Sequence, residues 1–200
     1  MIDLFIRAAF VENLALAFFL GICTLLGGSR RVGTAAGLGV AITLVMVFTV
    51  PLNYLVFHGL LAPAAWTWAG MPELDLSHLS LICFIGLIAA TVHVLELVLD
   101  RFFPALAQAL GIFLPLITVN CAILGGSLFM VDRHYSLTES VVFALGSSVG
   151  WALAVMALAA IRERIDGPDR DEASRSQALV FVAIGVMSMG YLVFSGVQLA

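Results

Sequence analysis

The chain has 200 residues, of which 62% are hydrophobic and 11% are charged, and its mean hydropathy is +1.11. A typical soluble domain has about 25% charged residues, and a soluble protein this apolar would expose large hydrophobic patches to water. The composition therefore indicates an integral membrane protein in a lipid bilayer. A formal charge of −4, with nine arginines and no lysine, excludes the basic surface of a nucleic-acid-binding protein.

Six apolar stretches reach the length of about 20 residues that a transmembrane helix needs. They are residues 6–26, 35–61, 79–99, 104–131, 140–161 and 177–198. The sequence therefore predicts an all-α integral membrane protein, with six transmembrane helices in a single membrane domain. Residues 1–4 lack the basic residues of a secretory signal, so we expect the first stretch to be retained as a helix.

The distribution of arginine predicts the orientation of these helices. If the N-terminus lies outside, the cytoplasmic loops contain seven of the nine arginines, and only Arg7 and Arg133 remain outside. An excess of basic residues on the cytoplasmic side is the usual pattern in membrane proteins. We therefore expect both termini on the outer side.

A short motif occurs twice, about half a chain apart. Cys23–Ser29 and Cys121–Ser127 share the pattern Cys-x-x-Leu-Gly-Gly-Ser, which relates the first predicted helix to the fourth. Three helices per half is an odd number, so the second half would enter the membrane in the opposite sense. The sequence thus predicts two inverted three-helix repeats, at about residues 1–99 and 100–200.

The residues around the motif indicate breaks in the helices that carry it. A glycine pair follows each cysteine, and Gly111, Pro115 and Asn120 precede Cys121. Such residues weaken a helix, and a break within a membrane is tolerated only where protein or a cavity satisfies the freed backbone groups. We expect the first and fourth helices to be discontinuous, with half-helices meeting near the middle of the membrane.

The two repeated cysteines are candidate metal ligands. Thiolates suit iron–sulfur clusters, zinc or copper(I), and a [2Fe–2S] cluster needs four of them. Cys23 and Cys121 supply two, so the other pair would come from a paralogue or from a second copy of the chain. The competing interpretation is that they are small buried apolar residues, and we expect that role for Cys83, which lies outside the repeat.

Two carboxylates within the apolar stretches are candidates for an ion path. Charged groups inside a membrane are rare and usually functional. Glu96 lies near the cytoplasmic end of the third helix, where it either pairs with Arg101 or takes part in the uptake of a cation. Glu12 either forms a structural pair or lines an ion path.

Several longer stretches resemble one family of membrane proteins. The matching stretches are residues 12–16, 19–23, 95–104, 110–123, 160–163 and 194–199. This family includes the E subunits of the sodium-translocating NADH:quinone oxidoreductases and the A subunits of Rnf complexes. Residues 12–16, 100–104 and 196–199 favour the first branch.

The resemblance implies an electron-relay role in a bacterial inner-membrane complex that couples electron transfer from NADH to quinone with sodium export. Cys23 and Cys121 would ligate a [2Fe–2S] cluster shared with the paralogous D subunit of that complex. NADH, FAD, FMN and riboflavin would bind only to partners, among the A, B, C and F subunits. The chain itself has no nucleotide-binding motif, so it would have no independent active site.

Three alternatives stay open from the sequence. The first is the Rnf homologue, with a different electron donor. The second, of another class, is a small secondary transporter, because inverted repeats with broken helices also occur in transporters. The third is a structural membrane scaffold without a cofactor.

Overall fold

The computed structural model describes residues 1–62, 76–102, 114–165 and 173–196, and every regular element within these ranges is helical. The first part contains α1 (Ile2–Ile6), a π-helical turn (Arg7–Val11), α2 (Ile22–Gly28), α3 (Val32–Val56) and a second π-helical turn (Phe57–Leu61). A 3₁₀ turn (Ser77–Leu79), α4 (Ser80–Phe102), α6 (Leu114–Thr118), α7 (Cys121–Asp132), α8 (Leu137–Ile165) and α9 (Ala173–Gly196) follow. The predicted all-α architecture is confirmed for the described residues. Residues 104–113 of the fourth predicted helix lie outside them.

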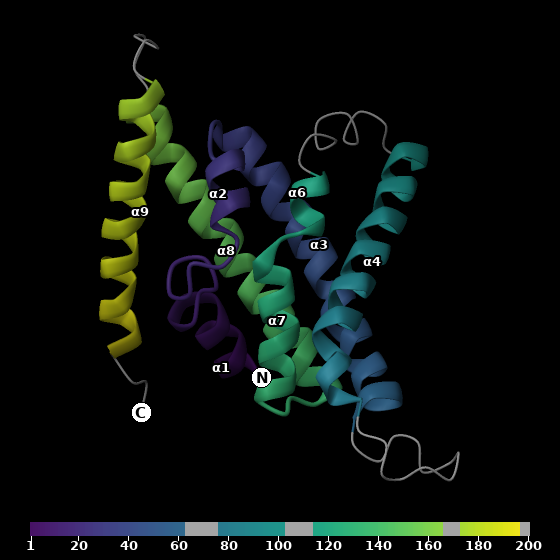
Figure 1. Cartoon of the computed structure of the whole chain (residues 1–200). Coiled ribbons are helices and arrows are strands. Elements are labelled where there is room, and N and C mark those ends of the chain that lie inside the picture. The colour runs from purple at the N-terminus through teal and green to yellow at the C-terminus, as the bar shows by residue number, and fades with distance from the viewer. Residues whose placement is uncertain (63–75, 103–113, 166–172, 197–200) are drawn as a thin grey trace, which may run out of the picture.

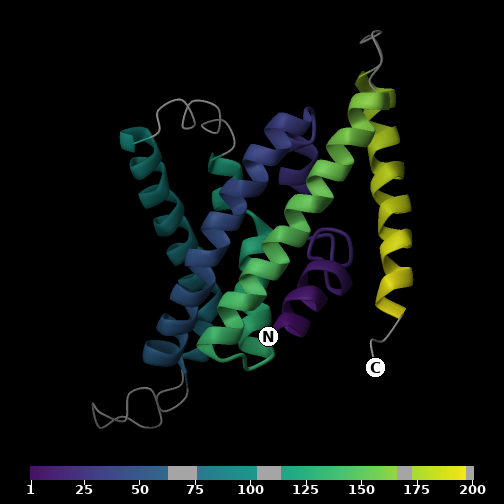
Figure 2. The same ribbon diagram turned by 180° about the vertical axis from the view of Figure 1, so that it is seen from behind.

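The long helices α3 and α8 form the centre of the molecule and run side by side in both views (Figures 1 and 2). A Cβ atom added at Gly39 on α3 would lie 2.8 Å from the Cβ of Ala152 on α8, so the two backbones approach closely there. Small residues at such a crossing allow the close packing that holds helices together in membranes. Helices α4 and α9 stand at opposite sides of this pair (Figure 1).

Within the part of the chain that the structure describes, three helices are long and apolar enough to cross a membrane. They cover Val32–Leu61, Ser77–Phe102 and Leu137–Arg164, and the apolar segments Cys121–Asp132 and Ala178–Val193 are shorter. Helix α4 exposes large apolar side chains along most of its length, as expected for a surface that faces lipid.

Both segments predicted to be discontinuous are interrupted in the structure. Residues 12–21 are not helical and separate the first π-helical turn from α2, and Phe19 and Gly21 there have φ values of 55° and 80°. Helix α6 ends at Thr118, and the extended backbone of Asn120 (ψ 114°) precedes α7. Figure 1 shows α1 and α2 joined by the first interruption, and α6 and α7 joined by the second.

The glycine pairs are not where the helices break, which corrects the expected cause. Gly27 and Gly28 lie in α2, and Gly125 and Gly126 lie in α7. Gly126 contacts Met46 of α3 so closely that a Cβ atom would overlap its side chain. The glycines therefore serve helix packing, and the interruptions precede the cysteines.

Candidate metal centre at two helix breaks

Cys121 is the first residue of α7, and the residue before it caps the helix. The Oδ1 atom of Asn120 accepts a hydrogen bond of 2.9 Å from the amide of Ala122, as an N-cap residue does. The Asn120 side chain is buried, with 1% of its surface exposed, and its Nδ2 atom has no hydrogen-bond partner among the described residues. The residue before Cys121 therefore carries a buried NH₂ group that is unpaired among the described residues.

The other helix break contacts the Cys121 sulfur directly. The amide of Gly21, which is the N-cap residue of α2, donates a hydrogen bond of 2.9 Å to Cys121 Sγ. A Cβ atom at Gly21 would lie 2.7 Å from Trp151 Nε1 and 2.8 Å from Asn120 Oδ1, and the φ of 80° disfavours any side chain. Glycine is therefore required for this close approach.

Cys23 lies close in the chain to the glycine that contacts Cys121. It is the second residue of α2, two residues after Gly21, and its side chain is exposed. The contact recorded for its sulfur is with Thr24 Oγ1 at 3.8 Å. Both repeated cysteines therefore stand at the starts of half-helices that meet at this junction, whereas Cys83 lies on α4 and is exposed.

Among the described residues, no three His, Cys, Asp or Glu side chains converge on a common point. A four-thiolate centre at Cys23 and Cys121 would thus need two further ligands from another chain. The exposure of Cys23 leaves room for such a chain to approach.

Side chains from two neighbouring helices satisfy the backbone of the first break. Ser188 on α9 donates a hydrogen bond of 2.6 Å to the carbonyl of Leu16, and Trp151 Nε1 on α8 donates one of 3.3 Å to that of Leu20. Neither donor was expected from the sequence. In the sequence, Ser188 and Trp151 are visible only as polar or amphipathic residues inside otherwise apolar helices. That pattern does not specify which group they bond.

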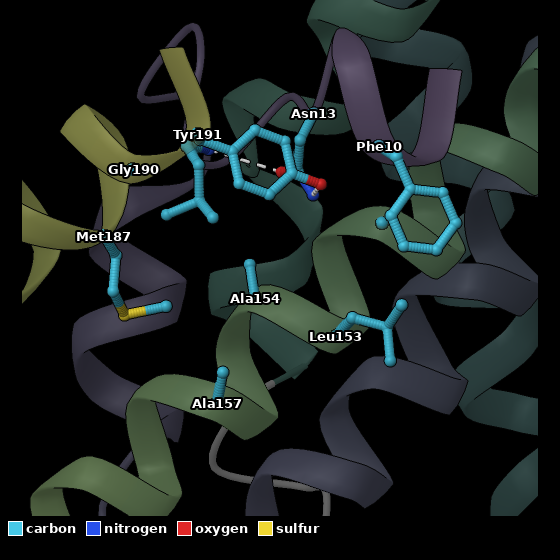
Figure 3. Close-up of a pocket in the computed structure, with 10 residues that line it drawn as sticks. Phe10, Asn13, Leu153, Ala154, Ala157, Met187, Gly190 and Tyr191 are labelled. Carbon is cyan, nitrogen blue, oxygen red and sulfur yellow. Dashed lines mark hydrogen bonds between the residues drawn. The ribbon is translucent and has the colours of Figure 1, made fainter. Parts of the chain in front are cut away.

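Asn13 starts the break by folding its side chain back on the chain. Its Oδ1 atom accepts a hydrogen bond of 2.9 Å from the amide of Ala15, and its Nδ2 atom donates to the carbonyl of Ala9 and to the hydroxyl of Tyr191. Asn13 and Tyr191 line one end of a pocket of about 350 Å³ beside α8 and α9 (Figure 3). The remaining walls are largely apolar: Phe10, Leu16, Gly150, Leu153, Ala154, Ala157, Met187 and Gly190.

The end of α8 fixes the far end of α2. The Nη1 atom of Arg162 donates hydrogen bonds to the carbonyl of Leu26 (2.9 Å) and to Ser29 Oγ (3.1 Å). The next residue, Glu163, accepts a hydrogen bond of 2.8 Å from the amide of Val32 at the start of α3. A cation at the C-terminus of α2 and an anion at the N-terminus of α3 both complement the helix dipoles.

Glu12 lies in the first break and forms ion pairs with two arginines. Its carboxylate pairs with Arg133, at the end of α7, and with Arg7 at 3.1 Å. Burial lowers the pKa of Arg133, but the hydrogen bonds that this guanidinium donates to Tyr135 and Glu12 outweigh burial and raise the pKa above its ordinary value. The guanidinium therefore keeps its charge.

Glu96 lies on α4, away from these pairs. Its carboxylate is 3.3 Å from Nδ1 of His93, one helical turn earlier, and 41% of its side chain is exposed. The recorded partner is thus His93 and not Arg101, because the i, i+3 spacing places His93 on the same face of the helix.

Known proteins resemble this chain along nearly its whole length. Residues 1–198 match the family described as "Rnf-Nqr subunit, membrane protein". The E subunits of Na(+)-translocating NADH-quinone reductases are 56% identical in Idiomarina loihiensis, 55% in Ectopseudomonas mendocina and 54% in Pseudomonas aeruginosa. Each similarity covers 99% of this chain and 98% of the relative.

Proposed function

We propose, because the chain belongs to the Rnf-Nqr family of membrane proteins, that it is the E-type subunit of a sodium-translocating NADH:quinone reductase and holds half of an intramembrane [2Fe–2S] cluster. The observation that carries this proposal is the junction itself. The two helix breaks meet there, because the amide of Gly21, two residues before Cys23, donates a hydrogen bond to Cys121 Sγ.

The residues at the junction fit such a group. The Gly21 amide already donates to Cys121 Sγ, as it would to a thiolate. The neighbouring residue Asn120 carries a buried Nδ2 donor that is unpaired among the described residues. Cys121 is also the first residue of the 12-residue helix α7. The partial positive charge at a helix start would favour the negative charge of a cluster bound there.

The cluster, when bound, would supply a one-electron acceptor and donor within the bilayer. The residues of this chain would hold it and shape its surroundings. Cys23 and Cys121 would ligate iron, Gly21 would donate its amide hydrogen bond, and the cap formed by Asn120 would fix the start of α7.

We further propose a topology of six membrane crossings in two inverted repeats, with both termini in the periplasm of a bacterial inner membrane. Each proposed repeat has an interrupted first helix, and in both a cysteine opens or nearly opens the second half-helix, which supports this topology. The missing thiolates would come from the paralogous D-type subunit. NADH, FAD, FMN and riboflavin would bind to partners, among the A, B, C and F subunits.

Of the two candidate carboxylates, we propose that Glu96, rather than Glu12, lies on the sodium path. The Glu12 carboxylate is paired with two guanidinium groups that would compete with a sodium ion. Glu96 is partly exposed on the apolar helix α4, and its recorded partner is a histidine. An exposed carboxylate there is more available to a cation.

The test is the iron and labile-sulfide content of the purified complex, together with its electron paramagnetic resonance spectrum after reduction. We expect one cluster at the junction in the wild type, its loss in Cys23→Ser and Cys121→Ser, and its retention in Cys83→Ser. A full cluster in Cys121→Ser would contradict the ligand assignment. A wild-type pair of this chain with its paralogue that contains no iron would favour a transporter or a scaffold, and reduction by ferredoxin instead of NADH would favour the Rnf branch.

A further inference from the structure

The peptide unit that joins Leu20 to Gly21 is held on both of its sides. Its carbonyl accepts a hydrogen bond of 3.3 Å from Trp151 Nε1, and its N–H donates the 2.9 Å bond to Cys121 Sγ. A peptide unit is planar, so its carbonyl and its N–H turn together. The indole of Trp151 bonds the carbonyl side of the peptide, and Cys121 Sγ accepts from the N–H side. The indole therefore controls the direction of the N–H that reaches the sulfur.

We propose that Trp151 is a positioning residue that sets the reduction potential of the metal centre at Cys121 by fixing the Leu20–Gly21 peptide. This inference rests on the proposed function, because it needs a cluster at that sulfur. The proposed role assigns a part in tuning the metal centre to Trp151 on α8, a residue that lies outside both cysteine motifs.

Two features make the indole necessary. Gly21, on one side of the peptide, has a φ of 80°, and glycine can adopt many other conformations. Trp151 itself is fully buried at the midpoint of α8, so its indole has a fixed position. Without the indole donor, the peptide is free to rotate and its N–H can leave the sulfur.

The electrostatic consequence has a definite sign. Reduction adds negative charge to an iron–sulfur cluster, and an N–H donor stabilises negative charge on sulfur, so this hydrogen bond raises the reduction potential. The contact recorded for Cys23 is weaker, since it is a hydroxyl at 3.8 Å. The two ligands from this chain are therefore unequal, and Cys121 is the one that Trp151 controls.

The experiment is a redox titration of the intact complex, monitored by electron paramagnetic resonance, which compares the wild type with the variant Trp151→Phe. Phenylalanine keeps an aromatic ring in the core and removes the Nε1 donor. We expect the midpoint potential of this cluster to fall by about 59 mV, which is a tenfold change in a one-electron equilibrium constant. The iron–sulfur(Cys) stretching frequency in resonance Raman spectra should shift as well.

Ser188→Ala is the matched control. It also removes one side-chain donor to a carbonyl of the same break, that of Leu16, but the peptide concerned does not reach Cys121. We expect an unchanged potential in this variant. A wild-type potential in Trp151→Phe with a full cluster, or an equal shift in Ser188→Ala, would overturn the inference.

A second substitution keeps the inference testable if Trp151→Phe does not assemble. A fluorinated tryptophan placed at position 151 keeps the shape of the side chain and makes its N–H a stronger donor. Because hydrogen bonds in a chain polarise one another, we expect a small rise in potential, and no rise would count against the inference. Absence of iron in the wild-type complex would instead refute the proposed function, so the two failures are distinguishable.

Discussion

The amide of Gly21 donates a hydrogen bond to the sulfur of Cys121, 2.9 Å away, although 100 residues separate them in the sequence. This contact joins the break of one helix to the start of another. It places a backbone donor on a thiol inside an apolar protein. The relationship depends on glycine, since a Cβ atom would collide with the indole of Trp151.

The first prediction concerns that glycine. Gly21→Ala places a Cβ atom 2.7 Å from Trp151 Nε1 at a φ of 80°, and strained backbone of this kind costs about 1–3 kcal/mol. We expect a loss of thermal stability of the complex in detergent. Gly37→Ala on α3 is the control, because a Cβ atom there meets nothing within 4 Å. Equal melting temperatures for the two variants would contradict this prediction.

The second prediction concerns the cap that α8 places on α2. Arg162→Ala removes the donor to the carbonyl of Leu26 and the hydroxyl of Ser29 and leaves the 3.4 Å bond between these two groups. A lost hydrogen bond at a buried polar group costs about 1–3 kcal/mol. We expect earlier unfolding in a denaturant titration. Arg164→Ala, at an exposed position of the same helix, should change the stability by less than about 0.5 kcal/mol. Equal losses in the two variants would show that the cap contributes nothing of its own.

The third prediction concerns a buried hydrogen bond between α3 and α7. Asn53 Nδ2 donates to Ser127 Oγ at 2.7 Å, and both side chains are fully buried. Interhelical hydrogen bonds in membranes contribute about 0.6 kcal/mol on average, so a double-mutant cycle of Asn53→Ala and Ser127→Ala should give a coupling of that order. Thr43 bonds the carbonyl of Gly39 within α3, and its cycle with Ser127 should give no coupling.

The fourth prediction separates the two candidate carboxylates. Glu96→Gln should lower the sodium dependence of quinone reduction with little change in stability, because the carboxylate is partly exposed. Glu12→Gln should mainly lower stability, because it leaves the partly buried guanidinium of Arg133 without its ion pair. Sodium titrations of the turnover rate and melting curves of both variants would test this. The opposite assignment of effects would reverse their proposed roles.

Part of this arrangement could be predicted from the sequence. The length of the apolar stretches identified α3, α4, α8 and α9, because lipid leaves few alternatives to a helix. The cause of the breaks could not be predicted, because glycine pairs weaken helices in general. Here Gly27–Gly28 and Gly125–Gly126 lie within helices. Three of these glycines pack against side chains of other segments: Gly28, Gly125 and Gly126.

The partners that satisfy the breaks were also invisible to the sequence. Trp151 and Ser188 are distant in the chain, and their donors are identified only when α8 and α9 are packed against residues 12–21. Likewise, the matching motifs of Cys23 and Cys121 indicated a shared role, but nothing in those motifs specified the amide of Gly21 as a donor.

A density map of the assembled complex, at a resolution that locates iron, tests the central claim most directly. We predict iron within bonding distance of the sulfur atoms of both Cys23 and Cys121, with two further thiolates from a neighbouring chain. Sulfur atoms of this chain that carry no metal in an active, fully assembled complex would contradict that claim.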